Sequence, residues 1–304
     1  MKILVTGGAG FIGSNIVDAY IEAGHEVAIL DNLITGKKAN INPKAKFYEV
    51  DIRTQQVAEV LNEFQPEIVN HLAAQIDVRK SVTDPAFTED VNVLGGINML
   101  EAAVKAKVKK IVFSSTGGAI YGEIADQNGA DENHPQDPIS PYAITKRSLE
   151  MFLYFYHVTY GINYTVLRYG NVYGPRQDPL GEAGVIAIFI GKLAKNEDPT
   201  IFGDGEQLRD YVYVGDVARA NLLAVTQGEG QIYNVGSGVG TSVNQLFAHL
   251  KSIMKFPGKV VYAPPRTGEL TRSVLNAQKI EKALGWKPQM DIRQGLELTV
   301  KATA

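Results

Sequence analysis

The sequence is bounded first by what it lacks. None of its 304 residues is a cysteine, which excludes disulfides, thiolate catalysis and zinc–thiolate sites. It holds no apolar run of the roughly 20 residues that cross a bilayer, and no apolar leader precedes the strand-like segment at residues 1–6. These absences lead us to expect a cytoplasmic protein with no membrane partner.

The charged residues and the histidines form no pattern that would indicate nucleic-acid or metal binding. The 30 Lys and Arg residues are balanced by 33 Asp and Glu residues, a net charge of −3, so we expect no nucleic-acid partner. The five histidines lack the spacing of metal ligands, and no metal site is predicted. An apolar share of 45% is typical of a globular protein. The length allows one large core and a smaller lobe.

Short apolar segments alternate with helical stretches through the first half of the chain. We expect strands at 2–6, 26–31, 46–50, 67–72, 109–114 and 163–168, and helices near 11–24, 55–64, 86–106 and 141–160. The alternation predicts an α/β fold, a doubly wound parallel sheet (Rossmann) with a smaller α/β lobe. We assign residues 1–168 plus 211–236 to the sheet domain and 169–210 plus 237–304 to the lobe.

A glycine-rich loop follows the first predicted strand and leads into a helix. In the segment at residues 6–13, Gly7 can make the tight turn, Gly10 lets the backbone approach a pyrophosphate, and Gly13 allows the helix to pack closely. The second strand ends in Asp31, placed to accept a hydrogen bond from a ribose 2′-hydroxyl. A carboxylate there would repel a 2′-phosphate, so the predicted cofactor is NAD rather than NADP.

Three further candidates for dinucleotide contacts follow later strands. Asp51 and Ile52 come after the third strand and could contact adenine. The segment of Leu72, Ala73 and Ala74 after the fourth is small enough for the dinucleotide to lie against, and Asn92 lies in the next helix. Each pattern alone also suits ordinary packing, but ligands bind at the carboxyl ends of such strands.

Tyr142 and Lys146 carry the predicted chemistry. Ser140 can cap their helix, Pro141 suits its first position, and Gly161 can end it. Spacing of i to i+4 places the phenol and the ammonium on one face. A lysine charge about 6 Å away, at an effective dielectric constant of ~20, is worth roughly 2–3 kcal/mol, enough to lower a tyrosine pKa by about two units. The pair therefore predicts a tyrosinate acid/base.

Together these motifs resemble the extended short-chain dehydrogenase/reductase superfamily, and in particular its UDP-glucose 4-epimerase (UDP-galactose 4-epimerase) family. The matching motifs span essentially the whole chain and lie at residues 6–13, 31–32, 51–52, 71–74, 114–122, 142–146, 167–175, 209–211 and 266–269. The resemblance implies further NAD contacts at Phe11, Ile12, Asn32, Ser114 and Tyr169, the last beside the nicotinamide.

The resemblance also implies the substrate contacts. Thr116 is expected beside the sugar's 4-oxygen, although the run that follows is one residue longer than usual, which leaves Ser115 open for that role. Arginine can hold phosphate oxygens in a fork. The contacts expected around the UDP moiety are Asn171, Arg209 and Arg266 on the diphosphate or ribose, and Val185 with Ile186 near the uracil.

The activity implied is reversible C4 epimerisation of UDP-glucose and UDP-galactose. Tyr142 takes the 4-hydroxyl proton while NAD takes the C4 hydride, and the resulting 4-keto sugar turns before the hydride returns. Gly117 and Gly118 stand where related 4,6-dehydratases place acids, so dehydration is not expected. UDP-glucuronate 4-epimerisation or decarboxylation stays open, because Arg79, Lys80, Arg176 and Arg272 could hold a carboxylate. A non-catalytic NAD-binding regulator is the alternative of another class.

By the resemblance, Ser273 borders the sugar's 2-substituent, where a large aromatic residue would restrict it, so UDP-N-acetylglucosamine and its 4-epimer are expected to be accepted. Two helices resemble those that pair in a homodimer. Their expected apolar interface residues are Met99, Leu100 and Ala103 on the first, and Leu149, Met151, Phe152 and Phe155 on the second.

Overall fold

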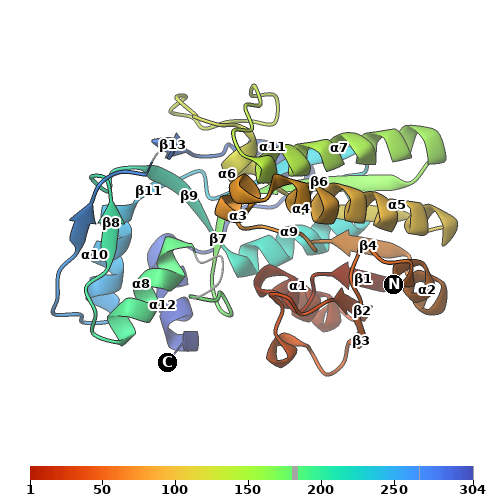
Figure 1. Ribbon diagram of the computed structural model, residues 1–304, viewed down its shortest axis with the longest axis horizontal. Coiled ribbons are helices and arrows are strands. Elements are labelled where there is room, and N and C mark those ends of the chain that lie inside the picture. The colour runs from red at the N-terminus through yellow and green to blue at the C-terminus, as the bar shows by residue number, and fades with distance from the viewer. Residues whose placement is uncertain (180–183, 267, 304) are drawn as a thin grey trace.

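A parallel sheet forms the centre of the larger part of the molecule (Figure 1). The computed structural model describes residues 1–179, 184–266 and 268–303. Seven strands lie in the order β10–β6–β5–β4–β1–β2–β3, all parallel to their neighbours. Their bounds are β1 Lys2–Thr6, β2 Glu26–Asp31, β3 Lys46–Glu49, β4 Ile68–His71, β5 Lys110–Thr116, β6 Asn163–Tyr169 and β10 Gln231–Val235. The predicted doubly wound fold is confirmed.

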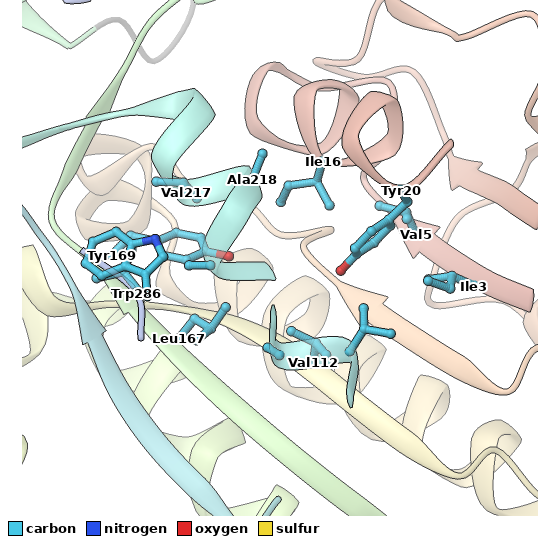
Figure 2. Packing of buried hydrophobic residues seen from close by; sticks show 14 of the residues in the cluster. Ile3, Val5, Ile16, Tyr20, Val112, Leu167, Tyr169, Val217, Ala218 and Trp286 are labelled. Atoms are coloured by element: carbon cyan, nitrogen blue, oxygen red, sulfur yellow. The ribbon is translucent and has the colours of Figure 1, made fainter. Parts of the chain in front are cut away.

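Helices cover both faces of this sheet because successive strand residues point to opposite sides. On one face Ile3 and Val5 pack with α1, α9 and α11, and Figure 2 shows part of this cluster with Tyr20, Tyr169 and Trp286. On the other face Leu4 packs with α2, α5 and α7. The bounds are α1 Phe11–Glu22, α9 Val214–Thr226, α11 Gln278–Leu284, α2 Gln56–Phe64, α5 Gly95–Lys105 and α7 Pro141–Tyr160.

The smaller lobe has its own core and two small sheets. Strand β9 lies between β11 and β13 and also pairs with β7, while β12 pairs with β8. Helices α8, α10 and α12 supply much of the apolar cluster around Phe189 and Leu246. The bounds are β7 Asn171–Tyr173, α8 Val185–Ala194, β8 Thr200–Phe202, β9 Leu208–Tyr213, β11 Gly240–Ser242, α10 Val243–Ile253, β12 Val261–Ala263, β13 Arg272–Ser273 and α12 Ile292–Thr303.

The chain crosses between the two parts more than once. It leaves the main sheet after β6, returns through α9 to β10, and then leaves again. At the crossing, the buried Asp210 in β9 accepts hydrogen bonds from the backbone nitrogens of Ser237, Gly238 and Leu275. Because β9 pairs within the lobe, the return to the main sheet begins at α9, a little after the boundary predicted at residue 211.

The predicted helix at 86–106 is interrupted. It consists of α4 Pro85–Glu89, a π-helical turn η2 Asp90–Leu94 and α5. Such turns place one extra residue in a helix and often mark functional positions. The remaining short elements are η1 Lys38–Asn40, α3 Val78–Thr83 and α6 Gly117–Ile120. Within the described ranges, no helix combines the length and apolar character needed to cross a bilayer.

The prediction of the residues that form the dimer surface is wrong in part. Met99, Leu100, Ala103 and Leu149 are at most 3% exposed, because they pack against the main sheet in the cluster on the α7 side. Phe152 is partly buried in the same cluster. Of the residues named for that surface, only Met151 and Phe155 are exposed.

Candidate functional site

The glycine loop leaves the backbone N–H groups at the start of α1 available for a ligand. Gly10 occupies the N-cap position and offers no side-chain cap. Gly7 has a φ of +70°, and a Cβ there would lie 2.9 Å from the backbone nitrogen of Ala73. A Cβ on Gly13 would lie 2.1 Å from the carbonyl oxygen of Gly7. Only glycine fits these positions, and an uncapped helix start suits a pyrophosphate.

Asp31 is the last residue of β2 and contacts this loop. It is 7% exposed, and its carboxylate accepts hydrogen bonds from the backbone nitrogens of Ala9 at 3.0 Å and Leu33 at 2.8 Å. Burial raises its pKa, and those two backbone hydrogen bonds oppose the rise. Each carboxylate oxygen keeps a further lone pair, so the predicted bond from a ribose hydroxyl fits this geometry.

The residues expected around adenine lie at the next strand end. The Asn32 amide donates to Asp51 at 3.0 Å, and Arg53 forms an ion pair with the same carboxylate at 2.8 Å. The hydrogen bond from Arg53 lowers the pKa of Asp51, which keeps it ionised. Ile52 is only 4% exposed and packs with the core under α5. Phe11 and Ile12 lie half-buried in the first turn of α1.

The small residues after β4 lie directly beside the glycine loop. The backbone nitrogens of Leu72 and Ala73 each donate to the Thr6 hydroxyl at 3.1 Å, and Leu72, Ala73 and Ala74 are half-buried. Asn92, in the π-helical turn, accepts from the Gln75 nitrogen at 2.7 Å. Its amide donates to the Gln75 carbonyl and the Thr145 hydroxyl. Asn92 therefore ties the segment after β4 to the helix that carries Tyr142 and Lys146.

The local signals around Tyr142 are confirmed. Helix α7 has Ser140 as N-cap, its side chain accepting from the Ala143 nitrogen, Pro141 in the first turn, and Gly161 at its end with a φ of +75°. Lys146 is 4% exposed, and its Nζ donates to the Ser114 carbonyl at 2.9 Å. Burial lowers the pKa of Lys146 to about 8, so the ammonium still predominates at neutral pH.

The hydroxyl run at the end of β5 points in alternating directions. Ser114 is hydrogen-bonded to the Tyr169 hydroxyl at 2.9 Å, and Asn221 donates to the same hydroxyl at 2.7 Å. Ser115 points to the opposite face and donates to the buried Glu150 at 2.6 Å. Since Ser115 is held there, Thr116 is the hydroxyl at this strand end that best suits a sugar. It is half-buried.

Tyr169 lies deeper than the sequence indicated. It is 5% exposed and packs in the core cluster of Figure 2. Burial raises its pKa to about 12, so the hydroxyl is neutral. Its hydroxyl links Ser114 on β5 to Asn221 on α9. Direct contact of Tyr169 with a nicotinamide stays a prediction.

Several expected substrate residues gather around Thr116. Ser273 pairs with Arg209 across β13 and β9, and its hydroxyl donates to the Gly118 carbonyl at 3.4 Å. A Cβ on Gly118 would lie 3.4 Å from the Asn171 side-chain oxygen. These residues bring the lobe to the carboxyl end of β5.

The contacts of the other expected substrate residues lie within the smaller lobe. The guanidinium of Arg209 is 3.8 Å from Glu269. Arg266 is exposed, with its guanidinium carbon 4.0 Å from the centre of the Phe202 ring. Val185 opens α8 and packs partly against the lobe core. The neighbouring Thr267 of the sequence motif lies outside the described residues. The roles of these residues in substrate binding stay predictions.

The comparisons with known proteins agree with this geometry. Residues 3–236 match the NAD dependent epimerase/dehydratase family. The chain belongs to this family. A UDP-glucose 4-epimerase of Thermotoga maritima, solved with UDP-glucose, is 51% identical with a TM-score of 0.98, covering 100% of this chain and 98% of that one.

Two other family members are similar over nearly their whole length. The UDP-glucose 4-epimerase of Thermus thermophilus, solved in complex with NAD, is 47% identical with a TM-score of 0.95, covering 99% of this chain and 98% of that one. The UDP-glucose 4-epimerase of Mycolicibacterium smegmatis is 42% identical over 99% of this chain and 98% of its own.

Three buried residues that support this epimerase-family site were not predicted from the sequence. Glu150, Arg168 and Asn221 are all at most 2% exposed. Glu150 accepts hydrogen bonds from Ser115 on β5 and Arg168 on β6, and Asn221 donates to Tyr169 at the end of β6. A signal existed for Glu150. It follows Lys146 by four residues and stands between the buried Leu149 and Leu153, which places a charge on the inner face of α7.

Proposed function

We propose that this chain is an NAD-dependent UDP-glucose 4-epimerase, an isomerase that interconverts UDP-glucose and UDP-galactose through a 4-keto intermediate. The observation that carries the proposal is the buried Lys146 ammonium, held at the end of β5 one helical turn after Tyr142. The similarity to the UDP-glucose complex, at 51% identity over the whole chain, supports the same substrate.

The dinucleotide would be held by the glycine loop, Asp31 and the segment of residues 72–74. Bound NAD supplies reversible oxidation at the sugar's C4. The protein residues supply proton transfer and position. Tyr142 as phenolate takes the proton of the 4-hydroxyl and later returns it, and the Lys146 charge favours the phenolate. Thr116 would hydrogen-bond the same oxygen.

The contacts that bind the substrate must allow the sugar to turn. Both faces of C4 have to be presented in one cycle, so the fixed contacts belong on the UDP moiety and not on the hexose. Arg209, Arg266 and Asn171 are proposed to hold the diphosphate, and Val185 the uracil. Arginines tolerate rotation of the sugar because their hydrogen bonds go to phosphate oxygens alone.

The test is product identification by NMR after separate incubation with UDP-galactose, UDP-glucuronate and dTDP-glucose. We expect UDP-glucose from the first and no product of comparable yield from the other two. Tyr142→Phe, which keeps the ring and removes the hydroxyl, should retain bound NAD and lose turnover by at least ~100-fold. Bound NAD without conversion of any of these sugars would instead indicate a non-catalytic protein.

Substrate range follows from the small residue at 273. Ser273 is buried beside Arg209 and Gly118, and we propose that its size leaves space for a 2-acetamido group. Ser273→Tyr should remove turnover of UDP-N-acetylglucosamine while UDP-glucose is still converted. Ser273→Ala is the matched control and should convert both. A wild-type enzyme that leaves the N-acetyl sugar unchanged contradicts the proposal.

A homodimer in the cytoplasm is proposed from the outer face of α7. Ile144, Met151, Tyr154, Phe155 and Val158 are each at least 47% exposed, and they follow one stripe of this long helix. Exposed apolar stripes of this kind mark interaction sites. Val158→Glu should shift the sedimentation coefficient to that of a monomer. Val239→Glu, at a residue 61% exposed in the other part of the molecule, should leave it unchanged. Absence of cysteine is consistent with the cytoplasm.

A further inference from the structure

A fully buried carboxylate lies behind the proposed catalytic residues. Glu150 follows Lys146 by one turn of α7, and its side chain is 0% exposed. It accepts hydrogen bonds from Arg168 Nε at 2.9 Å, Arg168 Nη2 at 2.6 Å and the Ser115 hydroxyl at 2.6 Å, with Arg147 3.4 Å away. Apolar residues of the same volume often stabilise a fold as well as a buried ion pair does. Stability alone therefore does not explain this arrangement.

The partners of Glu150 indicate what the arrangement does. Ser115 and Arg168 are register partners on β5 and β6, so one carboxylate joins α7 to both strands. Ser115 stands directly between Ser114, whose carbonyl accepts the Lys146 hydrogen bond, and Thr116. The helix is thus fastened to the end of β5 at two points one turn apart. This fixes its rotation and its height relative to the Thr116 hydroxyl.

We propose that Glu150 is a positioning residue for epimerisation, holding the helix of Tyr142 and Lys146 in register with the strand end that carries Thr116. The inference rests on the proposed roles of those three residues. Reacting groups must be held to within about 0.5 Å, and a displacement of about 1 Å can cost ~100-fold in rate.

Glu150 also acts on Lys146 through its charge. Burial lowers the pKa of Lys146, and the Glu150 carboxylate opposes that fall. The other groups facing Lys146 do not replace it. Burial keeps His71 on β4 neutral, with a pKa of about 3, and the other charged groups beside Glu150, Arg147 and Arg168, are cations. Without the carboxylate, Lys146 would lose its proton at a lower pH and support the Tyr142 phenolate less.

Two variants of the NAD-bound enzyme separate geometry from charge. Glu150→Gln keeps the side-chain shape and removes the charge. Ser115→Ala keeps the buried ion pair and removes the tie to β5. Asp216→Asn is the control, because Asp216 is a buried carboxylate on α9 that accepts from the backbone nitrogens of Gln289 and Met290. The readouts are kcat and KM for UDP-galactose against pH, bound NAD, and the ultraviolet titration of tyrosinate.

For Glu150→Gln we expect kcat to fall at least ~10-fold at neutral pH, with KM and bound NAD within about two-fold. The alkaline limb of kcat should move to lower pH, and the tyrosinate titration that Tyr142→Phe removes should move to higher pH. Ser115→Ala should lower kcat about three-fold or more without moving either titration. Asp216→Asn should match the wild type.

Other outcomes overturn the inference. Folded Glu150→Gln with wild-type kcat and pH profile would make the residue merely structural, and a parallel loss of bound NAD would make it a cofactor support. If Glu150→Gln does not fold, Ser115→Ala decides, and wild-type kcat in that variant refutes the positioning role. Failure of the proposed function itself would be seen separately, as absence of turnover in the wild type.

Discussion

Replacing Lys146 by Met should stabilise the NAD-free protein while removing its activity. Burial lowers the pKa of Lys146 to about 8 from an ordinary value of 10.5. A difference of this size corresponds to about 3 kcal/mol of unfolding free energy lost by carrying the buried charge. Met fills similar space without charge, but it loses the hydrogen bond to Ser114, worth about 1 kcal/mol. The expected net gain at pH 7 is about 2 kcal/mol.

The pH dependence gives the sharper test. Below about pH 8 both folded and unfolded Lys146 are protonated, and the wild type bears the full cost. Between pH 8 and 10.5 the unfolded state binds more protons than the folded state, so wild-type stability rises. The advantage of Lys146→Met should therefore shrink through this window. Urea unfolding followed by circular dichroism at several pH values measures it, on NAD-free protein because cofactor binding would add its own stabilisation.

A matched control lies on the same strand. Lys110 at the start of β5 is 4% exposed, donates to the Gln227 carbonyl at 2.5 Å, and has a pKa lowered to about 8 by burial. Lys110→Met should show the same pH-dependent gain and keep epimerase activity, since it lies at the opposite end of β5 from Ser114. If Lys146→Met is no more stable than the wild type at pH 7, or if its advantage is constant with pH, the reasoning is refuted.

The other predictions concern the ligand sites. Gly13→Ala should abolish bound NAD, because its Cβ would lie 2.1 Å from the Gly7 carbonyl oxygen; absorbance of NAD released from the purified protein measures this, and full occupancy would contradict it. Asp31→Ser should weaken NAD binding at least ~10-fold and reduce the preference for NAD over NADP, both measured by calorimetry. An unchanged preference for NAD would exclude Asp31 as the group that discriminates between the two cofactors. Arg209→Met should raise the dissociation constant of UDP by about ten-fold or more, whereas Arg293→Met on the surface of α12 should not.

Much of the sheet was predictable because its signals are local. The strand around Ile3 and Val5 is a continuous apolar run with a glycine turn after it, and the cap, proline and terminal glycine of α7 are each recognisable in sequence. The interruption at Asn92 was not predictable, because a π-helical turn depends on the bonds that its side chain makes to Gln75 and Thr145.

The supporting residues of the site were harder to predict for the same reason. Ser115 and Thr116 are similar hydroxyl residues in sequence, and only the hydrogen bond from Ser115 to Glu150 on α7 distinguishes them. The strand expected at 163–168 extends by one residue to include Tyr169, whose depth depends on Ser114 and Asn221, 55 and 52 residues away. Apolar helix faces likewise look the same whether they meet the sheet or solvent.

The interleaved path of the chain means that neither part can be obtained by cutting the gene once. A fragment ending after β6 would lack α9 and β10. The backbone edge of β6 would then be unpaired, and the apolar residues that pack with Tyr169 would be exposed to solvent. An exposed edge of this kind recruits other chains. Proteolysis or truncation near residue 169 should therefore yield insoluble material and not an isolated nucleotide-binding module.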